Sequence, residues 1–244
     1  MTSDEEKKGW VHEGFLANLV HDLKAPVITI GGYANRLLDR KMGDLTPEQQ
    51  KGLEIILRNC ERLEHDLQMI LQHMKVDLAE QLSLEVFDIT ETARRVCETL
   101  KPDAEKKNIS VDLKKAYEPV KIEADPLIIH KAIFNLVDNA IRYTDPGGKV
   151  QVTISLKEEF VDTRVADDGK GIEKQKLDLV LKPFEEVMEI RDRELRGFGL
   201  GLSNVQRYIE LHDGTLEAES TPGKGSEFTI RIPRSSQKAS GANS

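Results

Sequence analysis

The chain has 244 residues and a formal net charge of −8, with 32% charged, 39% hydrophobic and 5% aromatic residues. This length allows one large domain or two modest ones, and we expect two. The acidic balance argues against nucleic acid or an anionic membrane as the main partner. The two cysteines lack CxxC spacing, so we expect reduced thiols and no metal or disulfide framework.

No stretch is long and apolar enough to span a membrane, and the polar N-terminus is unlike a signal peptide. We therefore expect a soluble, cytoplasmic chain. This expectation remains compatible with an upstream sensor or membrane segment that anchors a longer protein.

A helical pattern runs over residues 5–40 and breaks at Gly43-Asp44. Its predicted apolar seam consists of Leu16, Leu19, Leu23, Ile30 and Leu37. His21 falls on the opposite face, where we expect its imidazole to point at solvent. Pro26 removes a backbone donor and should loosen or kink the helix just past this histidine. An ordinary solvated helix histidine is the alternative interpretation.

A second helix is predicted to open at Thr46, because Thr46 can cap it, Pro47 suits its first position and Gln49 completes a capping box. Its apolar stripe consists of Leu53, Ile56, Leu57, Cys60, Leu63, Leu67, Ile70, Leu71 and Met74. The seams of two such helices are too wide to cover each other, so we expect a dimeric four-helix bundle. An intramolecular hairpin lying on a second domain is the alternative.

From residue 84 the pattern changes to short strands and helices. Strands are predicted at 84–87, 109–113, 120–123, 150–156, 161–166, 215–219 and 227–232, and helices at 89–105, 126–142 and 202–211. Antiparallel strands with helices gathered on one face would form an α+β two-layer sandwich. We therefore expect an all-α hairpin domain at 1–82, an α+β domain at 83–234 and a disordered tail at 235–244.

Asn135 and Asn139 are spaced i and i+4 on one face of a predicted helix, with Arg142 about one turn further. Neutral amide oxygens beside a cation suit a Mg²⁺ ion that is held mostly by substrate phosphates and water. Two helix asparagines are also commonly capping or surface residues.

Two glycine-containing motifs follow in the same domain. Asp167-Asp168-Gly169-Lys170-Gly171-Ile172 comes directly after a strand, so a carboxylate lies beside backbone that a planar ligand can approach. Gly197-Phe198-Gly199-Leu200-Gly201-Leu202-Ser203 precedes a helix whose amides can hold phosphate, although it is neither a Walker A nor a Rossmann motif. Aspartate and glycine also fill ordinary turns.

Two further segments of this domain have simple interpretations. Gly223-Lys224-Gly225-Ser226 predicts a hairpin turn. The charged segment 173–196 has no clean period and is typical of a mobile lid. Its arginines, Arg196 among them, are candidates to contact a terminal phosphate, and a solvated loop is the alternative.

In this order the motifs resemble those of the sensor histidine kinases of two-component systems, from about residue 10 to 234. The H-box matches 21–26, the N-box 135–144, the G1 box 167–172, the F-box 183–184 and the G2 box 197–203. The resemblance implies a dimerisation and histidine-phosphotransfer hairpin followed by an ATP-binding domain of the type shared with gyrase, Hsp90 and MutL.

The resemblance also implies a homodimer that uses ATP and Mg²⁺ to phosphorylate His21 and passes the phosphoryl group to an aspartate on a response regulator receiver domain. Asp22 would act as general base, Asn139 would coordinate Mg²⁺, and Asp167 would accept a hydrogen bond from the adenine amino group. The implied nucleotide contacts are Asn135, Asn139, Arg142, Tyr143, Asp167, Gly169, Gly171, Ile172, Arg196, Gly197, Gly199, Leu200, Gly201 and Leu202.

One position departs from the family pattern. Ala25 stands four residues after the histidine, where phosphatase-competent members carry threonine or asparagine. We therefore expect weak or absent dephosphorylation of the partner. A kinase-dead scaffold and an ATP-hydrolysing clamp are the rival functions, and the scaffold is disfavoured by the presence of His21, Asp22, Asn139 and Asp167.

Overall fold

The structure is a computed structural model that describes residues 3–77, 82–114, 119–182 and 200–234, without the side chains of 3–19, 21 and 72–77. It contains two compact units, a helical hairpin up to Leu78 and an α/β unit from Ala79 onwards. Among the described helices, none combines the length and apolarity needed to cross a membrane. The predicted tail at 235–244 and F-box at 183–184 lie outside the described residues.

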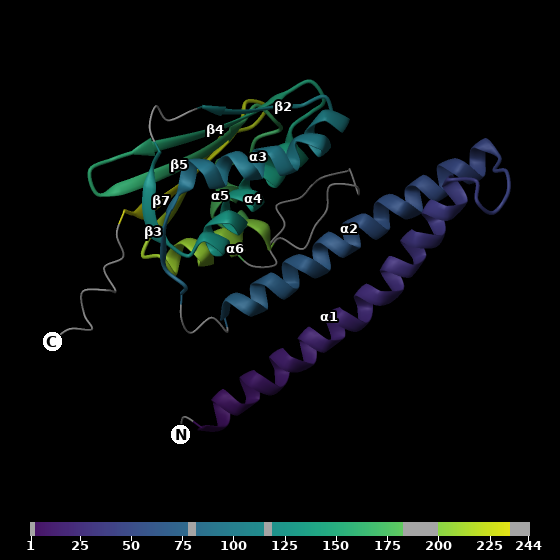
Figure 1. Cartoon of the computed structure of the whole chain (residues 1–244), viewed down its shortest axis with the longest axis horizontal. Coiled ribbons are helices and arrows are strands. Elements are labelled where there is room, and N and C mark those ends of the chain that lie inside the picture. Colours follow the sequence, from purple (N-terminus) through teal and green to yellow (C-terminus); the bar gives the residue numbers. More distant parts are fainter. Residues whose placement is uncertain (1–2, 78–81, 115–118, 183–199, 235–244) are drawn as a thin grey trace. The chain divides into compact units, whose positions relative to one another are not determined.

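The hairpin consists of helices α1 (Ser3–Leu38) and α2 (Pro47–Asp77) (Figure 1). The predicted capping box is confirmed: the Thr46 amide donates to Gln49 Oε1 at 2.9 Å, and the Gln49 amide donates to Thr46 Oγ1 at 3.2 Å. Helix α1 continues through Pro26, so losing one backbone donor does not end the helix there.

Within the single chain, the predicted seam of α1 is only partly buried. Its buried face is formed by Val20, Val27 and Ala34, and the first two cluster with Cys60 and Leu67 of α2. The predicted seam residues Leu23 and Ile30 are 46% and 52% exposed, Leu37 is half-buried, and Leu16 and Leu19 lie outside the described side chains. The smaller residues form the contact because they recur every seven positions on one face and allow close approach, whereas the larger ones flank that face.

The α/β unit alternates strands and helices along the chain. Its elements are β1 (Glu85–Asp88), α3 (Ile89–Lys106), β2 (Ser110–Lys114), β3 (Lys121–Ala124), α4 (Pro126–Tyr143), β4 (Lys149–Leu156), β5 (Phe160–Asp167), η1 (Lys174–Lys176), α5 (Leu177–Val180), α6 (Gly201–Glu210), β6 (Thr215–Thr221) and β7 (Gly225–Pro233). The two short helices η1 and α5 lie at the start of the charged segment 173–196, whose sequence has no clean period.

Five strands form one sheet in the order β2-β4-β5-β7-β6, and β1 pairs with β3 in a separate antiparallel ribbon. The expectation of purely antiparallel pairing is wrong for one pair, because β2 and β4 run parallel, with Ser110 opposite Lys149. A parallel pair needs a long crossover, and here β3 and α4 supply it.

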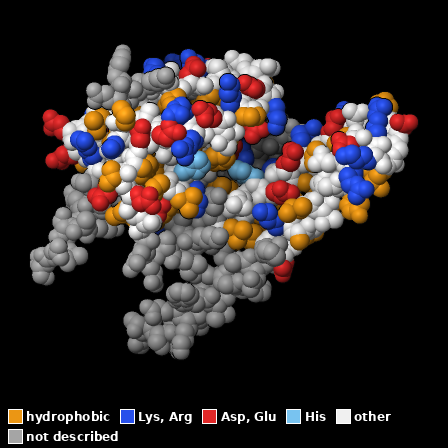
Figure 2. Space-filling view, viewed as in Figure 1, with side chains coloured by type: hydrophobic (Ala, Val, Ile, Leu, Met, Phe, Trp, Pro, Cys, Tyr) orange, Lys and Arg blue, Asp and Glu red, His pale blue; other side chains and the backbone are white. Residues whose placement is uncertain are grey.

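Helices α3, α4 and α6 pack on one face of this sheet, which confirms the two-layer arrangement (Figure 1). Alternate residues of β4 point into this layer, and the core includes Ile133 and Val137 of α4 with Val152 and Val165 of the sheet. Acidic and basic side chains are interspersed over the described surface in view (Figure 2). The α/β unit therefore has one apolar interior layer beneath a mixed-charge surface.

Candidate functional site

Helix α4 carries the paired asparagines because its start is fixed by strong local signals. Asp125 is its N-cap and accepts from the Leu127 and Ile128 amides, while Pro126 occupies the first helical turn. Asn135 is 5% exposed, and its Nδ2 has no hydrogen-bond partner within the described part of the chain. Because a buried amide without a partner is costly, Asn135 has polar capacity available for a ligand.

The start of α6 lies against Asn139. A Cβ atom added at Gly201 would lie 3.1 Å from Asn139 Nδ2, so a larger residue there would press on the asparagine amide. Leu200 is buried, Leu202 is half-buried, and the Ser203 hydroxyl donates to the Leu200 carbonyl at 3.1 Å. The fold thus brings two predicted motifs together, and the N-terminal amides of α6 lie beside the carboxamide of α4.

Asp167 lies at the end of β5, where two backbone amides hold one of its carboxylate oxygens. Its Oδ1 accepts from the Gly169 amide at 2.9 Å and from the Ser226 amide at 3.2 Å. Burial raises the pKa of Asp167, and these two amides oppose that rise. Within the described residues both hydrogen bonds fall on Oδ1, so Oδ2 remains available as an acceptor.

The glycines after Asp167 are required by the protein's own packing. Gly171 has φ +66°, and a Cβ there would collide with the Thr221 carbonyl, while a Cβ at Gly169 would collide with the Tyr143 carbonyl. The Ile172 amide donates to Ser220 Oγ at 2.7 Å. The loop is therefore locked between the end of α4 and the β6–β7 hairpin, a constraint that we had not predicted.

Gly225, which we expected only as part of a hairpin turn, and Lys107, which we had not predicted, both support this site. A Cβ at Gly225 would collide with the Asp167 carbonyl. Position 225 must therefore be glycine for the β6–β7 turn to lie this close to the Asp167 loop. Lys107 Nζ donates to the Ile141 and Arg142 carbonyls at 3.2 and 3.1 Å and so caps the C-terminus of α4. Burial, followed by the charge of Arg142, lowers the pKa of Lys107.

Arg142 and Tyr143 end α4 on the same side as the Asp167 loop. Arg142 lies 3.7 Å from Asp138, with both side chains mostly buried, and the Tyr143 carbonyl accepts from the Lys170 amide at 3.2 Å. Lys107 and Arg142 thus place two cations at the C-terminal end of the asparagine-bearing helix, where they contact helix carbonyls and Asp138. A phosphate is a group that the Arg142 guanidinium can bind in place of Asp138.

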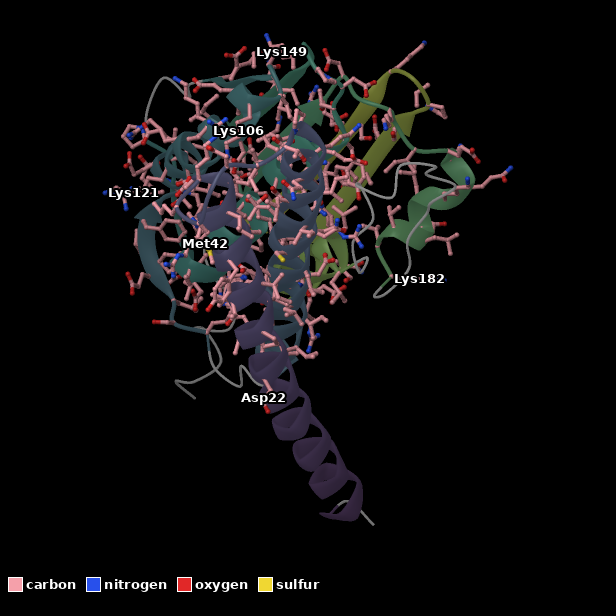
Figure 3. The ribbon with its side chains drawn as sticks, turned by 90° about the vertical axis from the view of Figure 1, so that its right-hand side faces the viewer. Asp22, Met42, Lys106, Lys121, Lys149 and Lys182 are labelled. Carbon is pink, nitrogen blue, oxygen red and sulfur yellow. The ribbon has the colours of Figure 1, made fainter. Side chains whose placement is uncertain are left out.

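Several predicted site residues cannot be placed in this way. The side chain of His21 and the residues Arg196, Gly197 and Gly199 lie outside the described residues. Asp22 lies on α1 with its side chain exposed (Figure 3). Within the described residues there is no cluster of three or more histidine, cysteine or acidic side chains that could hold a metal.

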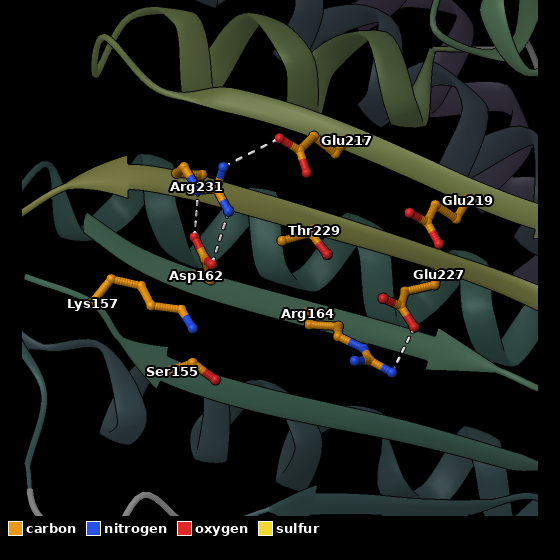
Figure 4. A pocket seen from close by; sticks show the side chains of 9 residues that line it. All are labelled: Ser155, Lys157, Asp162, Arg164, Glu217, Glu219, Glu227, Thr229 and Arg231. Carbon is orange, nitrogen blue, oxygen red and sulfur yellow. Dashed lines mark hydrogen bonds and ion pairs between the residues drawn. The ribbon is translucent and has the colours of Figure 1, made fainter. Parts of the chain in front are cut away.

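A groove of about 250 Å³ lies elsewhere, on the sheet face opposite the helices (Figure 4). Most of its charges pair with one another: Arg231 contacts Asp162 at 2.8 and 3.0 Å and Glu217 at 3.3 Å, and Arg164 pairs with Glu227 at 2.6 Å. These ion pairs engage five of the seven charged side chains that line the groove. We therefore assign the candidate site to the α4, α6 and Asp167 region, not to this groove.

Comparison with protein families gives two matches. Residues 12–77 match the His Kinase A (phospho-acceptor) domain, and residues 124–236 match the histidine kinase-, DNA gyrase B- and HSP90-like ATPase family. The first match covers the hairpin, and the second covers most of the α/β unit that contains the candidate site.

Similar curated proteins include two from Caulobacter vibrioides. One is the non-motile and phage-resistance protein, 31% identical over 92% of this chain and 27% of its own length. The other is the histidine protein kinase DivJ, 30% identical over 90% of this chain and 37% of its own length. The chain thus spans only about a quarter to two fifths of these relatives.

Similar solved structures include full-length ShkA in complex with AMPPNP, with 27% identity and a TM-score of 0.69 over 90% of this chain and 45% of that one. A second is histidine kinase ThkA in complex with the response regulator protein TrrA, with 26% identity and a TM-score of 0.65 over 96% and 66% of the two chains. Both matches extend over hairpin and α/β unit alike.

Proposed function

The chain belongs to the sensor histidine kinases, and we propose that it phosphorylates its own His21 with ATP and passes the phosphoryl group to an aspartate of a response regulator. Residues 1–82 would serve as the dimerisation and phosphotransfer domain and residues 83–234 as the ATP-binding domain. The observation that carries the proposal is the apposition of Asn139 with the N-terminus of α6 at Gly201.

The residues around Asn139 fit a magnesium nucleotide. Asn139 offers a neutral oxygen, which is a ligand type that Mg²⁺ accepts, and Asn135 offers a buried amide whose Nδ2 lacks a partner in the described chain. When bound, Mg²⁺ would neutralise charge on the transferring phosphate. Arg142 and the α6 amides would orient the phosphates, with Arg196, Gly197, Gly199, Leu200, Gly201 and Leu202 forming the phosphate loop.

The adenine end of the nucleotide would lie against the Asp167 loop. Asp167 Oδ2 can accept a hydrogen bond from the adenine amino group, because the Gly169 and Ser226 amides already use Oδ1. Tyr143, Gly169, Gly171 and Ile172 would form the wall beside the base. The lock between this loop and the β6–β7 hairpin would keep the carboxylate preorganised for binding.

His21 would be the nucleophile. A neutral imidazole nitrogen can form a P–N bond to the γ-phosphorus while the bond from that phosphorus to the β,γ-bridging oxygen breaks and ADP departs. Asp22 would accept a hydrogen bond from the other ring nitrogen and take up its proton as the P–N bond forms. The phosphoryl group would then pass to a carboxylate oxygen of the regulator.

A second copy of the hairpin would complete the bundle. Leu23, Ile30, Ile56 and Leu63 are large apolar side chains that are exposed along the two helices. Such a stripe matches an identical hairpin related by twofold symmetry. The exposed Ala25 offers no side chain to position a hydrolytic water, so phosphatase activity would be weak.

Incubation with γ-labelled ATP tests the proposal. We expect an acid-labile, alkali-stable label that is lost in His21→Gln and retained in His65→Gln, a matched histidine substitution on α2. A label that survives His21→Gln would refute the assignment of the phosphoacceptor. No label despite intact nucleotide binding would favour the scaffold.

Mixing His21→Gln chains with Asn139→Ala chains tests which subunit supplies the nucleotide. If phosphorylation runs across the dimer, the mixture will regain labelling, because an intact His21 will face an intact nucleotide site. If it runs within one subunit, the mixture will stay unlabelled.

A further inference from the structure

Helices α4 and α6 pack side by side, and each end of the pair is tied by a specific contact. At the nucleotide end, Gly201 of α6 abuts Asn139 of α4. At the other end, His212, just beyond α6, meets Asp125, the N-cap of α4. About 20 Å of helix separates Asp125 from Asn139, so this second contact has no direct role in holding phosphate.

The His212 ring is bound on both nitrogens. The side chain is 7% exposed; Nε2 lies 3.0 Å from the Asp125 amide nitrogen, and Nδ1 lies 2.7 Å from the Tyr208 carbonyl oxygen. A backbone amide can only donate and a carbonyl can only accept, so Nε2 must carry the lone pair and Nδ1 the hydrogen. The geometry therefore requires the neutral Nδ1–H tautomer.

Asp125, whose amide this ring holds, makes contacts in three directions. Its Oδ1 accepts from the Leu127 and Ile128 amides at 3.0 and 3.1 Å, which caps α4. Its Oδ2 accepts from the Ser83 amide at 3.0 Å. Ser83 belongs to the segment that leads from the hairpin into β1, so Asp125 joins that segment to the helix that carries Asn139.

We propose that His212 is a positioning residue: by holding the Asp125 backbone, its Nδ1–H imidazole lets the Asp125 carboxylate cap α4 and anchor the Ser83 amide of the interdomain segment. This inference rests on the proposed kinase function, in which the ATP-binding domain must be presented to a histidine on the hairpin. The anchor sets the point at which the chain leaves the domain. Its loss should therefore affect phosphoryl transfer more than nucleotide affinity.

The test compares His212→Phe, which keeps a ring but removes both nitrogens, with His130→Phe on α4, where the histidine ring stacks on Phe134. In the full chain we expect exchange of the Asp125 and Ser83 amides to become about five- to tenfold faster in His212→Phe and to stay unchanged in the control. The kcat of autophosphorylation should fall several-fold, with KM for ATP within about twofold of the wild type. Unchanged exchange, or a raised KM with unchanged kcat, would overturn the proposal.

The ring nitrogens of the unsubstituted protein provide a second measurement that does not depend on the variant folding. ¹⁵N chemical shifts at neutral pH should report His212 protonated on Nδ1 alone. An Nε2–H or doubly protonated ring would overturn the assignment. Neither the amide exchange nor the tautomer measurement depends on phosphoryl transfer. A protein that meets both expectations but does not label His21 would therefore contradict the proposed kinase function while still supporting the role of His212.

Discussion

Replacing Asp167 with asparagine should weaken ATP binding and, at the same time, stabilise the protein without nucleotide. Asparagine retains an oxygen that can accept from the Gly169 and Ser226 amides, so the loop geometry should survive. The second oxygen becomes an NH₂ group, which cannot accept from the adenine amino group. A hydrogen bond to a charged group is worth about 1.5–3 kcal/mol, so the Kd for ATP should rise roughly 10- to 150-fold.

The stability effect follows from the raised pKa of Asp167, which burial causes. The pKa of this carboxyl is higher in the folded state than its unfolded value of 3.8. Its protonated form therefore stabilises the fold fully below pH 3.8, and this stabilisation is lost as the pH rises through the folded-state pKa. Asparagine has no charge to desolvate. The free energy of unfolding of Asp167→Asn relative to the wild type should therefore be higher at pH 7 than at pH 3.5.

Calorimetric titration with a non-hydrolysable ATP analogue measures the first effect, and urea unfolding at the two pH values measures the second. Asp168→Asn is the matched control, because Asp168 Oδ1 accepts from the Lys149 amide at 2.7 Å on the outer side of the same loop. The control should leave the Kd within about twofold. An Asp167→Asn protein with wild-type affinity would refute the adenine assignment, and one whose relative stability falls from pH 3.5 to pH 7 would refute the electrostatic reasoning.

Three further predictions test other features of the protein. In urea unfolding, Gly171→Ala should destabilise the protein by more than the roughly 1–2 kcal/mol that a left-handed backbone costs an ordinary residue, because the added Cβ also meets the Thr221 carbonyl. The control Gly223→Ala has φ +72° and open space around the added Cβ, so it should cost only that amount. Ile30→Glu should shift the protein from dimer to monomer in sedimentation experiments, and a variant that remains dimeric would exclude this face as the interface. Ala25→Asn should speed the loss of phosphate from a receiver domain that this kinase phosphorylates, and an unchanged rate would contradict the explanation of weak phosphatase activity.

Elements whose signals are local were predictable from the sequence. The Thr46 capping box, the helix that carries Asn135 and Asn139, and the main strands all follow from periodicity and cap residues within a few positions. Large side chains misled the prediction for α1, where the contact face runs through Val20 and Val27. Size alone does not distinguish a face that meets its partner helix from one that remains uncovered in a single chain.

The remaining errors and omissions involve partners far away in sequence. Gly225 matters because it meets the Asp167 backbone, Lys107 because it reaches the end of α4, and His212 because it holds Asp125. The turn at Gly225 was predicted but its contact with Asp167 was not, and Lys107 and His212 have an unremarkable local context. Only the folded arrangement brings their partners to them, so spacing rules had no signal to detect.

The parallel pairing of β2 with β4 has a consequence for the order of folding. Among the described strands, β2 lies at the edge of the sheet and pairs with β4 alone, and β3 and α4 lie between the two in the chain. The loop-closure entropy of that connection must be overcome before the strands can pair, whereas β4 and β5 form a hairpin with a short turn. We therefore expect β2 to dock late on the folding pathway, with φ-values near zero for substitutions at Val111.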